Sequence, residues 1–307
     1  MAVEKPKIII IAGPTGAGKT GLAIELAREL NAEIVGADSM QIYRHMDIGT
    51  AKPTRQEQAA ATHHMIDIVD PDEDYDAAAY AEAAGCAIGQ IIAHGRLPLV
   101  VGGTGFYLKA LVYGLFKEGP SDPAVRRRLK QQAETQGGAR LHQRLVRVDR
   151  QAARNIHPND TFRVIRALEV FEITGETLSA FQQRHQFRQR RFDALTIGLF
   201  WPRAVLYDRI NRRVDGMMHQ GFENEVRWLL THGYHRDLRS MQSLGYRHLT
   251  AYINGESTRE HAVDTLKRDH RRYAKRQLTW FNADPTIRWM TPDQPRSALD
   301  CIEAFMA

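Results

Sequence analysis

The first hundred residues alternate between short apolar runs and segments in which apolar positions recur every three or four residues. Four consecutive isoleucines, 8–11, have the composition of a strand buried in a parallel sheet. Leu22, Leu26 and Leu30 follow at helical spacing. The same reasoning predicts, in chain order, a strand at 32–38, a strand at 63–69, a helix at 75–95 and a strand at 97–105. Such alternation is typical of a doubly wound α/β sheet, whose ligands bind at the carboxyl ends of its strands.

The alternation stops near residue 114, where helical patterns take over. The expected cap signals are Ser121 or Asp122 before Pro123, and Asn159 or Asp160 before a helix that Gly175 ends. Residues 192–201 predict a strand that returns to the sheet. Helices dominate after Pro202, and 286–290 predict one more short strand. A helical segment is therefore inserted into an α/β core.

A phosphate-binding loop directly follows the first strand. The segment Gly13, Pro14, Thr15, Gly16, Ala17, Gly18, Lys19 and Thr20 fits G-x-x-x-x-G-K-[ST] at every fixed position. Its backbone N–H groups would face an anion at the positive end of the following helix, and the Thr20 hydroxyl can bind Mg²⁺. The motif predicts a di- or triphosphate ligand without saying which one.

These patterns together predict an α/β fold with a P-loop NTPase-like parallel sheet core. Residues 1–116 and 193–307 are expected to form this core with its C-terminal helices. Residues 117–192 are expected to form an inserted helical domain, and the C-terminal part of the core is expected to be helical.

The net charge of the chain is +6, but the positive charge is concentrated in the insertion. Residues 117–191 carry 16 Lys and Arg against 8 Asp and Glu, a net charge of +8, which leaves −2 for the rest. This excess points to a polyanionic partner, with a solvated basic surface as the alternative. Two cysteines, and the lack of a signal peptide or a long apolar run, predict a cytoplasmic protein without membrane contact.

Asp38 ends the second predicted strand and is a candidate for proton transfer or metal binding beside the P-loop. The alternative is structural, because Asp38-x-x-Gln41 has the form of a capping box. The strand at 97–105 ends in Gly102-Gly103-Thr104-Gly105 and so lacks the acidic residue that organises Mg²⁺ in ATPases. This lack argues against a motor or a kinase.

A basic helix near the C-terminus is a candidate nucleic-acid surface. It is expected to begin with a capping box, Ser257-x-x-Glu260. Its cations are Arg268, Arg271, Arg272, Lys275 and Arg276, among the aromatic residues Tyr273, Trp280 and Phe281. This mixture suits looped or single-stranded nucleic acid, although aromatics in a core and solvated arginines would give the same pattern. The adjacent His63 and His64 would point to opposite faces of a strand, which disfavours a metal site.

Seven segments in order along the chain resemble the bacterial tRNA dimethylallyltransferase (tRNA isopentenyltransferase) family. They are "GPTGAGKT", "ADSMQIYRHMDIGTAKP", "HHMIDIVDP", "PLVVGGTGFYLKAL", "HPNDTFRVIRALEVFEITG", "SLGYRHL" and "YAKRQLTWF". The first is generic, whereas "DSMQIYRHMDIGTAKP" and "YAKRQLTWF" are specific to the family. Two positions depart from its usual pattern: Ala17 replaces a common serine, and His270 replaces a common threonine.

The resemblance implies transfer of a dimethylallyl group from dimethylallyl diphosphate to N6 of the adenine at tRNA position 37, beside the anticodon. The P-loop then holds a leaving diphosphate, and this chemistry needs no ATP, although the motif itself is of the nucleotide- and ATP-binding type. Asp38 is implied as the general base, with Lys19, Thr20, Mg²⁺ and Arg126 at the diphosphate. Implied tRNA contacts are Asp38, Ser39, Met40, Gln41, Thr104, Arg126, Phe162, Arg163, Val164, Ile165, Arg166, Arg271, Lys275 and Arg276.

Three other functions compete with this one. They are a P-loop small-molecule kinase, an isopentenyltransferase of free adenine nucleotides, and a non-enzymatic RNA-binding module gated by a nucleotide. The charge of the insertion disfavours a free-nucleotide acceptor, because a small substrate has no use for it. The expected partner is the tRNA anticodon stem-loop, and a monomer with no obligate protein partner is expected.

Overall fold

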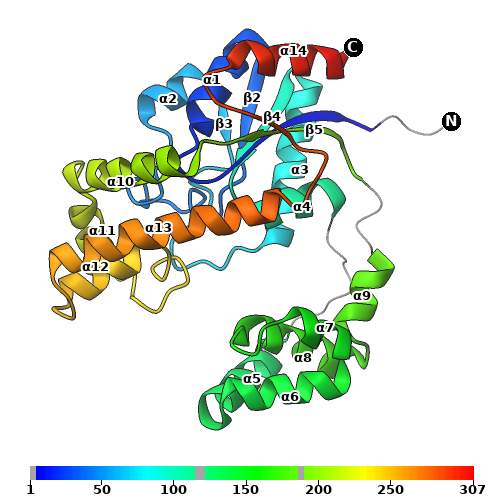
Figure 1. Ribbon diagram of the computed structural model, residues 1–307, viewed down its shortest axis with the longest axis vertical. Helices are drawn as coiled ribbons and strands as arrows, with labels where there is room; N and C mark the ends of the chain where they lie inside the picture. The colour runs from blue at the N-terminus through cyan, green and yellow to red at the C-terminus, as the bar shows by residue number, and fades with distance from the viewer. Residues whose placement is uncertain (1–4, 115–121, 186–189) are drawn as a thin grey trace. The chain divides into compact units, whose positions relative to one another are not determined.

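The computed structural model describes residues 5–114, 122–185 and 190–307 (Figure 1). The chain divides into two compact units. Met1–Val112 and Arg191–Ala307 form the first, called here the core unit, and Tyr113–Arg190 form the second, called the inserted unit. Among the described residues, no helix is long and apolar enough to cross a membrane.

A six-stranded sheet in the order β3-β2-β4-β1-β5-β6 forms the centre of the core unit. Its strands are β1 Lys7–Ala12, β2 Ala32–Gly36, β3 His63–His64, β4 Leu97–Gly102, β5 Asp193–Leu199 and β6 Arg288–Met290. Every neighbouring pair is parallel, which confirms the predicted sheet. The third strand is shorter than predicted, because Met65 (φ 64°) and Asp67 (φ 54°) adopt left-handed backbone conformations that no strand contains.

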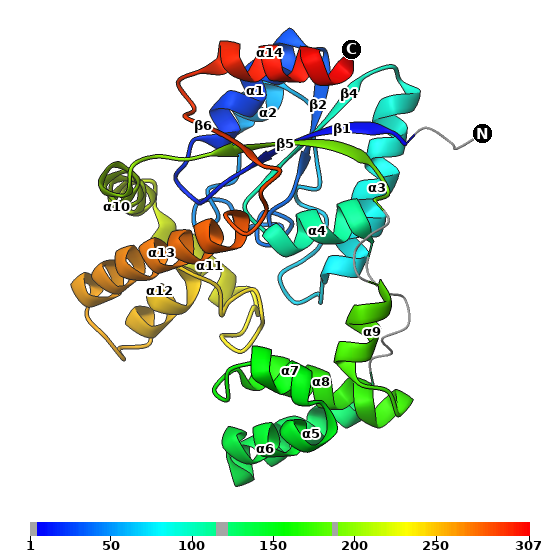
Figure 2. The ribbon, with the colours of Figure 1, turned by 45° about the vertical axis from the view of Figure 1, so that its right-hand side comes forward.

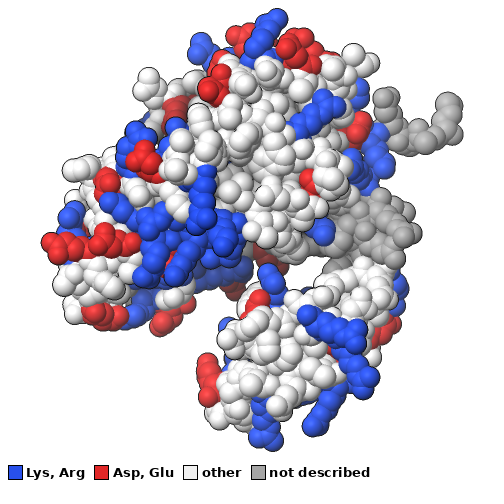
Figure 3. Space-filling model, in the orientation of Figure 1, with Lys and Arg blue, Asp and Glu red and all other residues white. Residues whose placement is uncertain are grey.

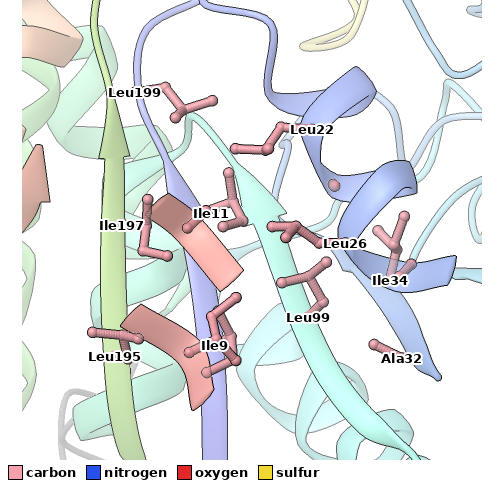
Figure 4. Close-up of a cluster of buried hydrophobic side chains, with 14 of the residues drawn as sticks. Ile9, Ile11, Leu22, Leu26, Ala32, Ile34, Leu99, Leu195, Ile197 and Leu199 are labelled. Atoms are coloured by element: carbon pink, nitrogen blue, oxygen red, sulfur yellow. The ribbon is translucent and has the colours of Figure 1, made fainter. Parts of the chain in front are cut away.

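Helices cover both faces of this sheet (Figure 2). The helices of the core unit are α1 Lys19–Glu29, α2 Arg55–Ala60, α3 Ala77–Ala93, α4 Gly105–Tyr113, α10 Arg203–His219, α11 Phe222–Thr231, α12 Tyr246–Ile253, α13 Arg259–Phe281 and α14 Pro295–Met306. Ile9 and Ile11 point to one face and pack with Leu22 and Leu26 of α1 (Figure 4). Ile8 and Ile10 are buried on the opposite face, since side chains alternate along a strand. This is why the first strand is continuously apolar.

The inserted unit is helical and has a core of its own. Its helices are α5 Pro123–Gln136, α6 Gly138–Val148, α7 Arg150–Asn155, α8 Thr161–Thr174 and α9 Leu178–His185. Leu129, Leu145 and Leu168 are each fully buried among them. No described Lys or Arg of this unit is buried, in keeping with the rarity of unpaired buried cations.

Local cap signals explain where several helices begin. Asp122 caps α5 by accepting from the backbone N–H groups of residues 124 and 125, while the alternative cap, Ser121, lies outside the described residues. Asp160 caps α8, and Gly175 ends it with a left-handed φ of 72°. The capping box predicted at Ser257 was wrong: α13 begins one residue later, and Thr258 accepts from the N–H of His261.

Candidate active site

The P-loop curls between β1 and α1 as its sequence predicts. Gly16 (φ 80°) and Gly18 (φ 96°) adopt conformations that side chains with a Cβ rarely take. The Lys19 ammonium folds back over the loop and donates to the carbonyls of Gly13 at 3.0 Å and Pro14 at 2.9 Å. Burial, helped by the nearby Arg213, lowers the pKa of Lys19 to about 8, and Asp38 opposes the shift. A bound anion would stabilise the charged form of an ammonium held in this way.

Three side chains from distant parts of the chain fix the shape of this loop. Gln277 of α13 accepts from the Thr15 N–H at 2.9 Å and donates to the Gly103 carbonyl at 2.9 Å. Arg209 of α10 donates to the Gly16 carbonyl at 2.9 Å. Trp201 donates to the Ala17 carbonyl at 3.1 Å, so the loop is braced on several sides.

Asp38 stands in the turn after β2, close to the P-loop cations. One of its carboxylate oxygens accepts from the backbone N–H of Met40 at 2.9 Å and of Gln41 at 3.4 Å. No helix follows directly, so the alternative interpretation of Asp38 as a helix cap was wrong, and the carboxylate instead closes an Asx turn. The Thr104 hydroxyl accepts from the Ser39 N–H at 3.1 Å, because β2 and β4 are paired and end together.

A cavity of about 1270 Å³ at the carboxyl ends of these strands brings most of the core-unit candidates together. It is lined by most of the P-loop, including Lys19 and Thr20, by Asp38, Ser39, Met40 and Gln41, and by residues of α10, α12 and α13. Thr104 reaches it indirectly, through its bond to Ser39. The Asp38 carboxylate acts electrostatically on both Lys19 and Arg213, so an acceptor for protons and a site for anions share one space.

Sequence reasoning missed the second set of cations in this cavity. Arg209 and Arg213 of α10 line it, and among the described residues neither has a carboxylate ion-pair partner. Burial is the main cause that lowers the pKa of Arg213, and Arg209 adds to it. Cations placed together without an ion-pair partner are expected where an anionic ligand binds. Their only signal in the sequence was a spacing of four residues, which puts them on one side of a helix.

The basic helix α13 presents two different surfaces. Lys and Arg gather on its solvent side (Figure 3), where Arg272, Lys275 and Arg276 are exposed. Arg271 is instead held at 2.6 Å by the Asn211 side chain. The aromatic residues divide as well, since Tyr273 lines the cavity, Phe281 is in the core and Trp280 is exposed.

The histidine that departs from the family pattern is part of the cavity wall. His270 is buried and lines the cavity. Burial, with a contribution from Arg213, lowers its pKa to about 4, so the imidazole is neutral at physiological pH. The two adjacent histidines considered as a metal site lie in different surroundings. His63 lines the cavity, whereas Nε2 of His64 lies 2.5 Å from the carboxylate of the buried Glu33.

The inserted unit contains the remaining predicted site residues. Arg126 and Arg166 both pair with Glu169, at 3.1 and 2.8 Å, and this carboxylate is fully buried. Phe162 is 70% exposed at the start of α8, and Arg163 beside it is exposed too. The side chains of Val164 and Ile165 are buried in the core of the unit and contribute no surface. Arg126 thus belongs to a different unit from Asp38 and the P-loop.

Lys19 supplies a pH-dependent prediction for the free protein. Affinity for a diphosphate ligand is expected to fall by about tenfold per pH unit above about 8, because binding then includes uptake of a proton by Lys19. Isothermal titration calorimetry between pH 7 and 9.5 would measure the effect. The Lys19→Met variant should bind weakly throughout and lack the step. A wild-type affinity that stays constant across pH 8 would contradict the position given to the ammonium.

The parallel sheet, the strand–P-loop–helix turn and the acid near it define a P-loop α/β protein with a cavity lined by several cations. Two family models match the chain: IPP transferase over residues 41–284 and isopentenyl transferase over residues 6–68. The chain belongs to the IPP transferase family, which is a family of transferase enzymes. The family expected from the sequence motifs is therefore confirmed.

Curated relatives and solved structures agree with this assignment. A tRNA dimethylallyltransferase of Desulfosudis oleivorans is 54% identical over 93% of this chain and 91% of its own. A tRNA dimethylallyltransferase 2 of Syntrophus aciditrophicus is 51% identical over 99% and 98%. The tRNA isopentenylpyrophosphate transferase of Bacillus halodurans has a TM-score of 0.74 at 40% identity, over 98% of this chain and 97% of its own. A eukaryotic dimethylallyltransferase acting on tRNA has a TM-score of 0.80 at 29% identity, over 94% and 74%.

Proposed function

We propose that this protein transfers a dimethylallyl group from dimethylallyl diphosphate to N6 of the adenine at position 37 of tRNA and releases diphosphate. The observation that carries the proposal is the cavity in which Lys19, Arg209 and Arg213 face the same space as Asp38. The names of the relatives, tRNA dimethylallyltransferases, support this reaction over a kinase or a binding module.

The first requirement of the reaction is to stabilise the negative charge on the leaving diphosphate. Negative charge grows on this group as the bond between carbon and oxygen breaks. Lys19, Arg213 and the N–H groups of the P-loop would stabilise this charge, and the cavity that they line would also orient the allylic carbon. We assign the diphosphate to residues 13–20, with Arg126 of the inserted unit as a further cation.

The nucleophile is the second requirement, because the lone pair of an exocyclic adenine amine is delocalised into the ring. A base must take its proton as the new bond forms. One oxygen of Asp38 is used by its turn, and no described side chain donates a hydrogen bond to the other. We assign Asp38 as this base, with residues 39–41 and Thr104 beside the adenine. The adenine must first turn out of the stacked anticodon loop.

A magnesium ion fits this site only as a companion of the diphosphate. The Thr20 hydroxyl and the Asp38 carboxylate line the cavity, but the described residues contain no group of three acidic, histidine or cysteine side chains that could hold a metal. Mg²⁺ commonly takes one or two protein ligands with water and phosphate oxygens. Bound with the diphosphate, it would neutralise charge on the leaving group. Thr20 is the side chain proposed to hold it.

We propose that the tRNA contacts exposed cations of both units, Lys275 and Arg276 of α13 and Arg163 of the inserted unit. The exposed Phe162 is proposed as a further contact. Arginine and lysine would neutralise backbone phosphates, and an exposed aromatic ring can stack on a base. We propose that the protein acts in the cytoplasm, together with its tRNA substrate, and that it acts as a monomer.

Mass spectrometry of tRNA after incubation with the protein tests the function. With Mg²⁺ and dimethylallyl diphosphate we expect one adenosine beside the anticodon to gain a dimethylallyl group, and omission of ATP should change nothing. Alkylation that requires ATP would contradict the proposed use of the P-loop. Alkylation of AMP in preference to tRNA would show that the acceptor is a free nucleotide.

The inserted unit yields a prediction about salt dependence. Arg163→Ala should reduce the slope of log affinity for tRNA against log salt by roughly 0.7 to 0.9 if its guanidinium contacts one phosphate. Its side chain is 65% exposed and lies 3.4 Å from Asp160, so the substitution leaves the fold intact. Arg296→Ala in α14, 83% exposed, is the matched control and should keep the slope. An unchanged slope for Arg163→Ala would exclude it from the tRNA surface.

A further inference from the structure

The loop of residues 44–51 follows the Asp38 turn, and its residues 47–51 line the cavity beside it. It belongs to no helix or strand. His45 (φ 65°) and Ala51 (φ 49°) both adopt the left-handed conformation that residues with a Cβ rarely take. Such a backbone persists only where its surroundings hold it, so the contacts of this loop matter for the site.

Glu225 of α11 holds the middle of this loop through both of its carboxylate oxygens. Oε2 accepts from the backbone N–H of Asp47 at 3.0 Å and of Ile48 at 2.7 Å. Oε1 accepts from the N–H of Gly49 at 3.1 Å and from the Tyr246 hydroxyl at 2.6 Å. Burial and the Glu225 carboxylate raise the pKa of Tyr246 well above its ordinary value, so the hydroxyl stays protonated and donates. One carboxylate therefore serves four donors.

Packing against aromatic rings also holds the middle of loop 44–51 in place. A Cβ on Gly49 would lie 2.2 Å from the Phe222 ring and 2.7 Å from the Tyr246 ring, so only glycine fits between the loop and these rings. Phe222 and Tyr246 meet edge to face with their centroids 5.0 Å apart. The loop is thus both hydrogen-bonded and wedged against α11 and α12.

Hydrogen bonds continue from this loop to the Asp38 turn. The Gln41 side chain donates to the carbonyls of Thr50 at 3.2 Å and Ala51 at 3.1 Å. The backbone N–H of Gln41 in turn donates to Asp38 at 3.4 Å. A continuous set of contacts therefore runs from α11 through the loop to the acid in the cavity.

We propose that Glu225 is a positioning residue, which holds loop 44–51 so that Gln41 and, through it, Asp38 keep their place in the cavity. This inference rests on the proposed role of Asp38 as the base. Glu225 would act without touching either substrate. Glu223, two positions earlier on the same helix, pairs instead with Arg227 and Arg259 and forms no hydrogen bond or ion pair with the described residues of the loop.

The Glu225→Gln variant tests the proposal, with Glu223→Gln as the matched control. Each oxygen of Glu225 already accepts from two donors, so either orientation of a glutamine turns its NH₂ group toward donors. We expect kcat for tRNA alkylation to fall by about 10- to 100-fold, as for a misplaced catalytic group, with KM for dimethylallyl diphosphate nearly unchanged. Hydrogen exchange at the amides of residues 47–49 should accelerate. Glu223→Gln should match the wild type in all three measurements.

A double-mutant cycle separates positioning from general loss of structure. If Glu225 acts through Asp38, Glu225→Gln should cost little more in a protein that already carries Asp38→Asn. Fully multiplicative losses, or a Glu225→Gln variant with normal kcat, would overturn the inference. Should Glu225→Gln not fold, Tyr246→Phe removes one donor of the four and should lower kcat several-fold, and a normal kcat would be decisive against the proposal. Failure of the wild type to alkylate tRNA would reject the proposed function as well.

Discussion

Replacing Asp38 with asparagine is expected to slow alkylation of tRNA by roughly 10²- to 10⁴-fold at saturating substrates, because an amide cannot accept the proton. The turn itself should survive, since the asparagine oxygen can accept from Met40 and Gln41 as the carboxylate does. Stability should change by no more than about 0.5 kcal/mol. Single-turnover kinetics and a thermal melt are the measurements.

The affinity for dimethylallyl diphosphate distinguishes this variant from one with a damaged site. Asp38 places a negative charge beside Lys19 and Arg213, so its removal should leave binding of dimethylallyl diphosphate equal or tighter. Glu57→Gln is the matched control, because Glu57 also lines the cavity and glutamine serves its capping box equally well. Normal turnover by a stable Asp38→Asn variant would assign Asp38 to its turn alone and require another base.

Removing the Arg213 guanidinium is expected to lower kcat/KM for dimethylallyl diphosphate by roughly 10²- to 10³-fold, the usual effect of losing one donor to a developing anion. Arg213 is partly buried beside Lys19 and Arg209, and it has no carboxylate ion-pair partner among the described residues. Arg213→Ala would therefore lose a ligand contact rather than a structural ion pair. Steady-state kinetics with the donor varied would measure the loss.

The stability of the same variant should move in the opposite direction. Burial of the Arg213 guanidinium and its repulsion from Arg209 outweigh its attraction to Asp38, so the unliganded Arg213→Ala protein should melt at the same temperature as the wild type or higher. Arg203→Ala on the same helix removes an exposed arginine and should change neither quantity. A large loss of stability in Arg213→Ala with normal kcat/KM would mean that Arg213 is structural.

Local sequence determined those parts of the molecule that depend on neighbours in the chain. Four isoleucines before a glycine-rich loop can satisfy burial and hydrogen bonding only as a central strand that enters a phosphate-binding turn. Asp122 and Asp160 bond to N–H groups two or three residues ahead, so their caps could be predicted from spacing. The motifs near Asp38 and Gln277 also sufficed to predict the family.

Local sequence misled where two geometries share one pattern. Asp38-x-x-Gln41 fits a capping box and an Asx turn equally, and the choice depended on how the next segment packs against α11. Val164 and Ile165 lie beside Phe162 in the chain, but the helix turns them into the core of the inserted unit while Phe162 stays exposed. Position within a motif does not give the direction of a side chain.

Only the tertiary structure decided which charges meet at the P-loop. Arg209 and Arg213 approach from α10, and Gln277 approaches from α13, at 262 residues' separation from its partner Thr15. Nothing in the chain near these residues requires such contacts, because they follow from the packing of C-terminal helices against the carboxyl edge of the sheet. The same holds for Glu225, whose carboxylate is one ordinary acid in a helix until folding brings loop 44–51 to it. Long-range packing therefore brings these partners together, whereas the amino-acid pattern shows only that a side chain is able to form such contacts.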